Sequence, residues 1–432
     1  MKFRKTDYRL ICCATGRVFQ DEGWTLNDPQ CSSPSLVRAE YTKLQYNPRT
    51  DLDGFYRYAD WLPVRRTLAG SCAPVTYRSE ALAKELGLDS LYITFSGYWP
   101  EKGAYMETCS FKETEAYSVC GRIPEDNRKV LVVASAGNTA RAFAKVCSDN
   151  GIPLLLSIPQ DNISALWFKK PLDNCVKIIA SPKGSDYFDA IALSDIVCLS
   201  DRFMAEGGAR NIARRDGMGT TLLSAVECIG RIPDAYFQAI GSGTGAIAVW
   251  ENNLRLIQDG RWGSHRMKLY PSQNSPFTIM YDSWKAGSRN LIPMSPEDAR
   301  QAAAQIDAKV LSNRKPPYSL SGGLFDAMTD AGGDMFKVTN AQLREWQRKF
   351  SELEGNDIHE AAAVAVASLA QAVEDGTVGR EDVIMLNITG GGELRMKSEG
   401  EIHYAHPDLI LDPSGDTAEI IAKVESLFDN VL

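Results

Sequence analysis

A lysine at the start of an expected helix could do chemistry on a carbonyl group. Lys112 ends the run Glu-Thr-Cys-Ser-Phe-Lys, which follows a loop rich in glycine and proline and should open a helix that runs to about Cys120. The positive end of a helix dipole disfavours an ammonium group, so it lowers the pKa of the lysine and favours the neutral amine that forms Schiff bases. An exposed surface lysine is the alternative.

A second segment joins a buried strand, expected at 129–134, to a helix expected at 139–149. It is a run of small residues: Ser135, Ala136, Gly137, Asn138 and Thr139. Small side chains let the backbone approach a ligand, and the N–H groups at a helix start bind carboxylates or phosphates. The amide of Asn138 can both donate and accept, so it could meet a ring oxygen. A simple helix cap is the alternative.

A third segment is a glycine-rich turn between a strand and a helix: Gly241, Ser242, Gly243, Thr244 and Gly245. Backbone N–H groups in such a turn cradle phosphate. With Ala246 the run also has the G-x-G-x-x-A spacing of dinucleotide sites, which expect an acidic residue after the next strand. That strand, at 267–270, leads into 271–274, which has no acidic residue. A single phosphate group therefore fits better than NAD, although an NAD-dependent oxidoreductase and a bare turn stay open.

A fourth segment ends a late apolar strand at 383–388. Thr389 stands there before three glycines, Gly390 to Gly392. Its hydroxyl could bond a neutral ring nitrogen, and the glycines would leave room for a ligand. A tight surface turn is the alternative.

The elements around these segments alternate between strands and helices. Apolar runs predict further strands at 91–95, 154–158, 176–180 and 235–240, and periodic or alanine-rich runs predict helices at 218–229, 246–257, 296–309, 340–353 and 358–373. This order predicts an α/β fold with mostly parallel sheets and helices on both faces. Ligands of such sheets bind at the carboxyl ends of the strands, where all four segments lie.

Composition limits the class of protein. The 432 residues are enough for two subdomains, and a formal charge of -8 disfavours nucleic-acid binding. No apolar run approaches the ~20 residues that span a membrane, and no signal peptide is recognisable. The ten scattered cysteines are typical of reduced thiols. We therefore expect a cytoplasmic protein that binds small molecules, not nucleic acid or membranes.

In this order, over roughly 73–392, the four segments resemble the fold-type II pyridoxal-phosphate (PLP) enzymes, which are tryptophan synthase β-like, and the threonine synthase family most of all. The resemblance implies that Lys112 is catalytic and holds PLP as a Schiff base. It implies that Asn138 contacts the 3-oxygen of the cofactor, that the turn at 241–245 holds its phosphate, and that Thr389 bonds its ring nitrogen. The loop 135–139 would bind the substrate.

The resemblance also implies a domain organisation and a homodimer. The cofactor would lie between a large PLP-binding domain, 46–114 and 206–432, and a small α/β domain, 115–205. Residues 1–45 resemble the zinc-ribbon start of archaeal threonine synthases. Because only Cys12, Cys13 and Cys31 are present there, instead of paired C-x-x-C ligands, we expect a degenerate flap without metal.

The residues around Lys112 and the N-terminal segment are more similar to the cysteate synthases, a subgroup of that family in methanogenic archaea. This implies a β-replacement in which sulfite displaces phosphate from O-phospho-L-serine to give L-cysteate, on a route to coenzyme M. Lys112 would also be the base for the α-proton. A threonine synthase acting on O-phosphohomoserine and a silent binding relative stay open, and so does the choice between sulfite and sulfide. Four cations could line the cleft: Lys102, Arg210, Arg214 and Arg215.

Overall fold

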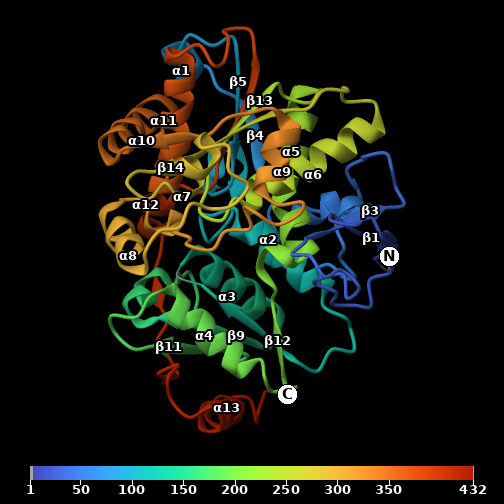
Figure 1. Cartoon of the computed structure of the whole chain (residues 1–432), viewed down its shortest axis with the longest axis vertical. Helices are drawn as coiled ribbons and strands as arrows, with labels where there is room; N and C mark the ends of the chain where they lie inside the picture. The colour runs from blue at the N-terminus through green and yellow to red at the C-terminus, as the bar shows by residue number, and fades with distance from the viewer. Residues whose placement is uncertain (1–2, 136, 432) are drawn as a thin grey trace.

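The computed structural model describes residues 3–135 and 137–431, and two open sheets organise them (Figure 1). The larger sheet has six strands in the order β15-β14-β13-β16-β5-β4, all parallel except the antiparallel edge strand β4. Its strands are β4 (Val75–Arg78), β5 (Ser90–Phe95), β13 (Ala235–Ala239), β14 (Lys268–Asn274), β15 (Phe336–Val338) and β16 (Val383–Ile388). The central strands are almost wholly apolar because helices cover both faces.

One face of this sheet packs against α11 (Glu360–Glu374), whose alanines are fully or nearly buried and let the helix lie close to β13, β14 and β16. Helix α5 (Ile212–Ile229) contacts β4 and β5, and α6 (Thr244–Asp259) packs beside α5. Figure 1 shows α10 and α11 on one side of the sheet and α5 and α6 on the other.

The smaller sheet has five parallel strands in the order β12-β8-β9-β11-β18. They are β8 (Val130–Ala134), β9 (Leu154–Pro159), β11 (Val176–Ser181), β12 (Phe203–Ala205) and β18 (Leu409–Ile410). Helix α3 (Asn138–Asn150) packs on α2 (Lys112–Arg122), whereas α4 (Tyr187–Val197) packs against α13 (Thr417–Ser426).

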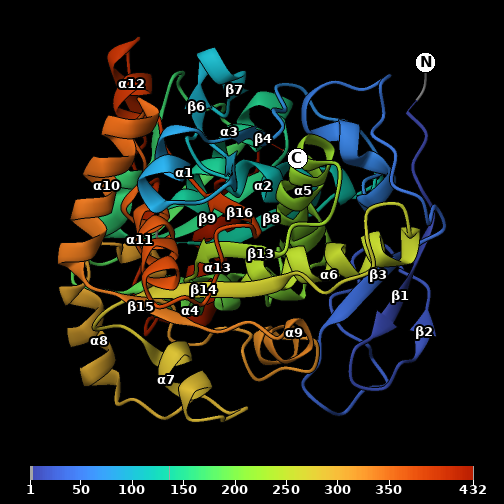
Figure 2. The ribbon, with the colours of Figure 1, turned by 90° about the horizontal axis from the view of Figure 1, so that it is seen from above.

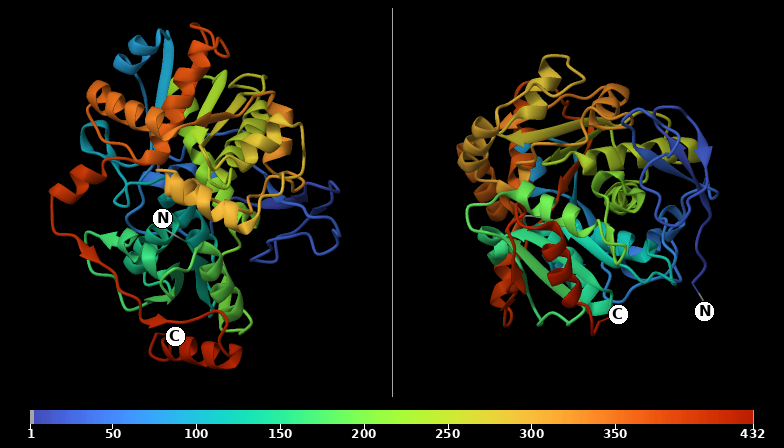
Figure 3. Two further views of the ribbon diagram at one scale, coloured as in Figure 1. Left: turned by 60° about the vertical axis from the view of Figure 1, so that its left-hand side comes forward. Right: turned by 60° about the horizontal axis from the view of Figure 1, so that its bottom comes forward.

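The end of the chain differs from the expected division of the molecule. The sequence places all of 206–432 with the larger sheet, but β18 pairs with β11 and α13 contacts α4, both in the smaller unit. Figure 3 shows this segment running back along the smaller sheet. The return was missed because β18 is only two residues long and carries no strand-like pattern of its own.

The N-terminal segment forms an antiparallel sheet in the order β2-β1-β3, which Figure 2 shows beside α6. Its strands are β1 (Tyr8–Cys12), β2 (Val18–Phe19) and β3 (Val37–Tyr41). Cys12 Sγ lies 3.6 Å from Ser35 Oγ, whereas Cys13 packs against Gly322. Within 3–135 and 137–431, no group of three or more His, Cys, Asp or Glu side chains is arranged to hold a metal ion.

The remaining elements connect these units. They are the helices α1 (Ala81–Leu86), α7 (Ile279–Lys285), α8 (Pro296–Gln305), α9 (Leu324–Ala331), α10 (Asn340–Glu354) and α12 (Glu393–Ser398), and the short strands β6 (Tyr98–Trp99), β7 (Ala104–Tyr105), β10 (Trp167–Phe168) and β17 (His403–Tyr404). None of the helices in the described ranges is long and apolar enough to cross a bilayer.

Candidate active site

The backbone joins the Lys112 segment to the Thr389 segment directly. The N–H of Phe111 donates to the carbonyl oxygen of Thr389 at 3.0 Å, and Ser110 forms a bridge with Gly390. A Cβ at Gly390 would lie 2.7 Å from the carbonyl oxygen of Cys109, so only glycine allows this approach. The first turn of α2 and the end of β16 therefore meet, as the sequence predicts.

Lys112 begins α2, and its side chain is mostly buried. Its Nζ donates to Glu115 Oε2 at 3.1 Å and lies 4.9 Å from the centre of the Phe111 ring. Burial lowers the pKa of Lys112; Glu115 opposes this, and the nearby Arg214 guanidinium adds to it. The expected lowering of the pKa is present, and loss of hydration on burial is its largest cause.

The loop before α3 places Asn138 at the first position of that helix. Its Oδ1 accepts a hydrogen bond from Arg141 Nη2 at 2.9 Å, and its Nδ2 is a donor with no partner among the described residues. The same guanidinium donates to the carbonyl oxygen of Thr108 at 3.0 Å, so Arg141 ties α3 to the segment before Lys112. Ser135 Oγ accepts from the N–H of Gly137 at 3.2 Å, and Thr139 is almost buried. Ala136 lies outside the described residues.

The glycine turn after β13 forms a tight N-terminus for α6. No side chain in the described part of the chain caps this helix at Gly243, whose φ is 78°. A Cβ at Gly245 would lie 2.6 Å from Gln238 Oε1, and one at Gly241 would lie 2.8 Å from the carbonyl oxygen of Val310. Ser242 Oγ and Thr244 Oγ1 are 2.8 Å apart. Neutral hydroxyls and uncapped N–H groups are a donor set suited to phosphate.

Val310 links this turn to the smaller sheet. Its backbone faces Gly241, and its Cγ1 would lie 3.9 Å from a Cβ at Gly137. Because β13, β16 and β5 are also neighbours in one sheet, the four predicted segments converge on a single region between the two sheets.

The structure does not support a dinucleotide site, because such a site needs an acidic residue at the end of the strand after the glycine turn. Strand β14 runs four residues further than expected, to Asn274, because Pro271 pairs only with β13 and needs no N–H on its other side. The strand then leads into Ser275 and Pro276, so no acidic residue stands at its end.

The four candidate cations have different surroundings. Arg214 binds Glu115 and Glu206, and Arg215 is buried against Glu251. Lys102 is exposed and lies over the ring of Tyr77, and Arg210 is exposed. Only Arg214 thus reaches the surroundings of Lys112.

Sequence reasoning missed Glu115 and Arg141 as parts of this region. The helical spacing of Lys112 and Glu115, three residues apart, was the available signal for the first. Arg141 stands three residues after Asn138, so the same rule could have found it. It also meets Glu393 at 3.7 Å, and His359 lies 3.0 Å from the same carboxylate. Burial opposes ionisation there, but His359, Arg141 and Lys397 lower the pKa of Glu393 to about 2.

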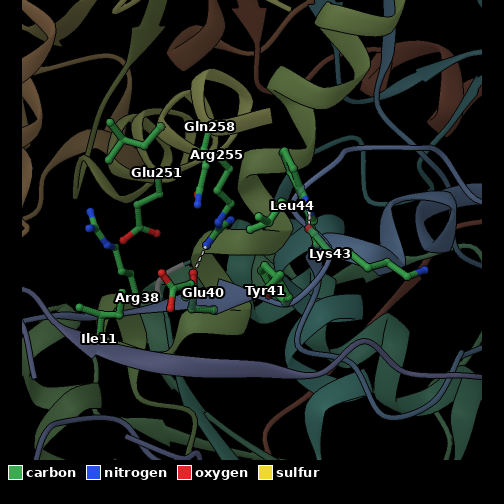
Figure 4. Close-up of a pocket in the computed structure, with 12 residues that line it drawn as sticks. Ile11, Arg38, Glu40, Tyr41, Lys43, Leu44, Glu251, Arg255 and Gln258 are labelled. Carbon is green, nitrogen blue, oxygen red and sulfur yellow. Dashed lines mark hydrogen bonds between the residues drawn. The ribbon is translucent and has the colours of Figure 1, made fainter. Parts of the chain in front are cut away.

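A separate cavity of about 80 Å³ lies between the N-terminal sheet and α6 (Figure 4). Arg255, on α6, donates to the carbonyl oxygen of Ala39 at 3.1 Å and pairs with Asp216. None of the four predicted segments lines this cavity, whose wall includes Arg38, Tyr41, Trp61 and Glu251. Hydrogen bonds from Arg255 to the carbonyl oxygen of Ala39 and from the Tyr41 hydroxyl to Asp216 join the flap to the larger unit.

Comparison with known proteins gives three findings. A model of pyridoxal-phosphate-dependent enzymes matches residues 73–390. The chain is 47% identical to a cysteate synthase of Methanocella paludicola, over 96% of this chain and 97% of that protein. It is 45% identical to a cysteate synthase of Methanosarcina mazei, over 94% and 97%.

Two solved structures resemble the fold. Maize serine racemase aligns with a TM-score of 0.57 and 16% identity over 74% of this chain and 88% of that one. The processed form of threonine deaminase isoform 2 from Solanum lycopersicum aligns with a TM-score of 0.55 and 17% identity over 76% and 84%.

Proposed function

The chain belongs to the pyridoxal-phosphate-dependent enzymes, and on that premise we propose that it converts O-phospho-L-serine and sulfite to L-cysteate and phosphate. Its α/β fold is the expected fold-type II architecture, and its cofactor is PLP. Support for the substrate pair comes from relatives named cysteate synthase that match nearly the whole chain. The structural observation that carries the proposal is the partly buried Lys112, whose side chain is 19% exposed, beside the Thr389 segment.

The residues present fit PLP. The uncapped turn 241–245, with Ser242, Gly243 and Thr244, would hold the phosphate through its N–H groups and hydroxyls. Side chains do not fit at Gly241 and Gly245, because a β-carbon at either position would collide with neighbouring atoms. Asn138 offers a free amide donor to a ring oxygen, because Arg141 occupies its acceptor. Thr389, a neutral hydroxyl, would bond the ring nitrogen without protonating it, which favours elimination over transamination.

Lys112 would hold the cofactor and later act as the base for the α-proton of the substrate. Its lowered pKa favours the neutral amine that both tasks need. When bound, PLP draws electron density away from the α-carbon. The C–O bond to phosphate would break at the β-carbon and a C–S bond to sulfite would form, after which Lys112 would return the proton to the α-carbon, with no net oxidation. The loop at 135–139, with Ser135 and Thr139, would orient the substrate carboxylate through its N–H groups.

Product identification tests this function. Purified holoenzyme incubated with O-phospho-L-serine and sulfite should release phosphate and form L-cysteate, and Lys112→Ala should abolish both. Borohydride should attach the cofactor to Lys112, which peptide mass spectrometry would show. Omitting sulfite is the control for the nucleophile, and sulfide in its place measures preference. Threonine formed from O-phosphohomoserine, without cysteate from phosphoserine, would overturn the proposal in favour of threonine synthase.

The proposal also covers the domain bounds, the cellular compartment and the oligomeric state. We assign 403–431 to the small domain with 115–205, and keep 46–114 and 206–402 as the large domain, because β18 pairs with β11. A reducing compartment, the cytoplasm, is supported by ten free thiols. A homodimer rests on the family resemblance, and sedimentation should give twice the chain mass of 47.6 kDa; a monomer would contradict it.

A further inference from the structure

Each carboxylate oxygen of Glu115 forms an ion pair, one with Lys112 and one with Arg214. It lies one helical turn after Lys112 and is fully buried. Its Oε2 is 3.1 Å from Lys112 Nζ, and its Oε1 is 3.1 Å from Arg214 Nη1. Arg214 in turn pairs with the buried Glu206. Lys112, Glu115, Arg214 and Glu206 therefore form a continuous row of alternating charges.

The charges of this row balance only while the nitrogen of Lys112 is positive. Two cations then face two anions in a site that water scarcely reaches. If the lysine nitrogen loses its proton, a net negative charge stays buried, which is costly. Arg214 Nη1 and Lys112 Nζ each lie 3.1 Å from an oxygen of Glu115, so this carboxylate contacts a cation on either side. The row thus opposes the effect of burial and favours a proton on the Lys112 nitrogen.

Other charged groups near the row do not replace Glu115. Tyr187, on α4, faces Arg214 and Glu206, and its pKa is raised by burial. Glu113 stands next to Lys112 in sequence and is equally buried, but it faces the other way. Its Oε1 accepts from the N–H of Thr108 at 2.6 Å, and its Oε2 is 3.9 Å from Lys145. Among the described side chains, Glu115 is the carboxylate in contact with Lys112 Nζ.

We propose that Glu115 is a catalytic residue that keeps the proton on the Lys112 nitrogen when this nitrogen is linked to the cofactor, and that Arg214 positions Glu115. A protonated C=N linkage is more electrophilic at carbon, so it is the form that the substrate amine attacks. Glu115 would thereby set the pH range in which the enzyme accepts substrate. The inference rests on the proposed function for the role of Lys112, but not on the identity of the substrate.

A pH titration of the bound cofactor tests this inference without turnover. The visible absorbance of substrate-free holoenzyme reports protonation of the linkage, and Glu115→Gln should lower its apparent pKa by about one unit or more. Glu115→Asp, which keeps the charge at a longer distance, should lower it less. The matched control is Glu113→Gln, on the same turn of α2, which should titrate like the unmodified enzyme.

The outcomes separate the inference from the function. An unchanged pKa in Glu115→Gln, or an equal shift in Glu113→Gln, would overturn it even if cysteate forms. If Glu115→Gln does not fold, an Asp variant that titrates like the unmodified enzyme would also overturn it. A lowered pKa supports it even when another product is found. Absence of any borohydride-fixed cofactor on Lys112 removes both claims.

Discussion

At the scale of single residues, the turn 241–245, which we propose binds the cofactor phosphate, depends on the absence of side chains. Gln238 stands directly beneath Gly245, and its amide belongs to a buried network with Tyr236 and Asn387. A β-carbon at Gly245 would have to displace that amide or shift the turn. The side chain that lies under the turn is therefore enough to require glycine at this position.

Gly245→Ala should weaken PLP binding by about tenfold or more, because the displaced turn misaligns the N–H groups that face the phosphate; tenfold corresponds to about 1.4 kcal/mol. Equilibrium titration of the apoenzyme with PLP measures it. Gly260→Ala, at the other end of α6, is the control: its φ of 80° makes alanine cost about 1 kcal/mol in stability, with no loss of affinity. Equal affinities for the two variants would contradict the role of Gly245.

At the scale of elements, the side chain of Arg141 connects α3 to three other elements. It lies on α3, donates to the carbonyl oxygen of Thr108 before α2, and approaches Glu393 at the start of α12 within 3.7 Å. It also lies 4.4 Å from the Trp167 ring of β10. Because the same side chain bonds Asn138, the position of the small sheet is coupled to the amide that we propose contacts the cofactor.

Arg141→Ala should lower both stability and PLP affinity. Removing a buried cation leaves Glu393 and the Thr108 carbonyl without this partner, which costs on the order of 3 kcal/mol in the free energy of unfolding. Denaturant unfolding and PLP titration measure the two effects. Arg141→Lys keeps the charge but loses the fork of donors, so it should recover part of the stability and little of the affinity. Unfolding at the same denaturant concentration as the unmodified enzyme would exclude this role.

The sequence predicted the apolar central strands of both sheets, but it placed no helix at α4, α9 or α13 and misplaced one end of α5 and of α8. Strand β16 was placed at its observed bounds, and β5, β8, β9, β11 and β13 within one residue at each end. Helix α5 begins at Ile212, six residues before the predicted start, because Asn211 caps it and Arg215 and Asp216 in its first turns are buried in ion pairs. Helix α8 ends at Gln305, four residues early, before the 3-10 turn at Lys309–Leu311. Composition marks such charged residues as surface, since the partners that bury them are distant in sequence. For the same reason the sequence indicated Arg214 as a candidate cation but did not predict its partners, Glu115 and Glu206.

At the scale of the whole molecule, the chain passes between the two units three times. It enters the smaller one through α2 and α3, returns before α5, and crosses again after α12 to add β18 and α13. Phe428, just after α13, is fully buried and packs edge-on against Phe203 of β12 at 5.9 Å between ring centres. The last segment thus closes an apolar core that the rest of the small unit leaves open.

Phe428→Ala should destabilise the protein by about 3 kcal/mol, because it leaves a cavity between α13 and the small sheet. Thermal or denaturant unfolding would measure the change. Leu199→Ala, which truncates a side chain that is 71% exposed, should change stability by no more than about 0.5 kcal/mol. A comparable loss in both variants would mean that the C-terminal segment does not contribute a core of its own.

The late return of β18 has a consequence for the order of synthesis. On the ribosome, β11 emerges long before its outer neighbour β18, and four strands of the larger sheet, β13 to β16, are made in the interval. During that time the outer edge of β11 and the apolar groups that α13 will cover are open to mispairing and aggregation. We therefore expect a nascent chain of this protein to depend on chaperones that cover this edge more than its ordinary composition suggests.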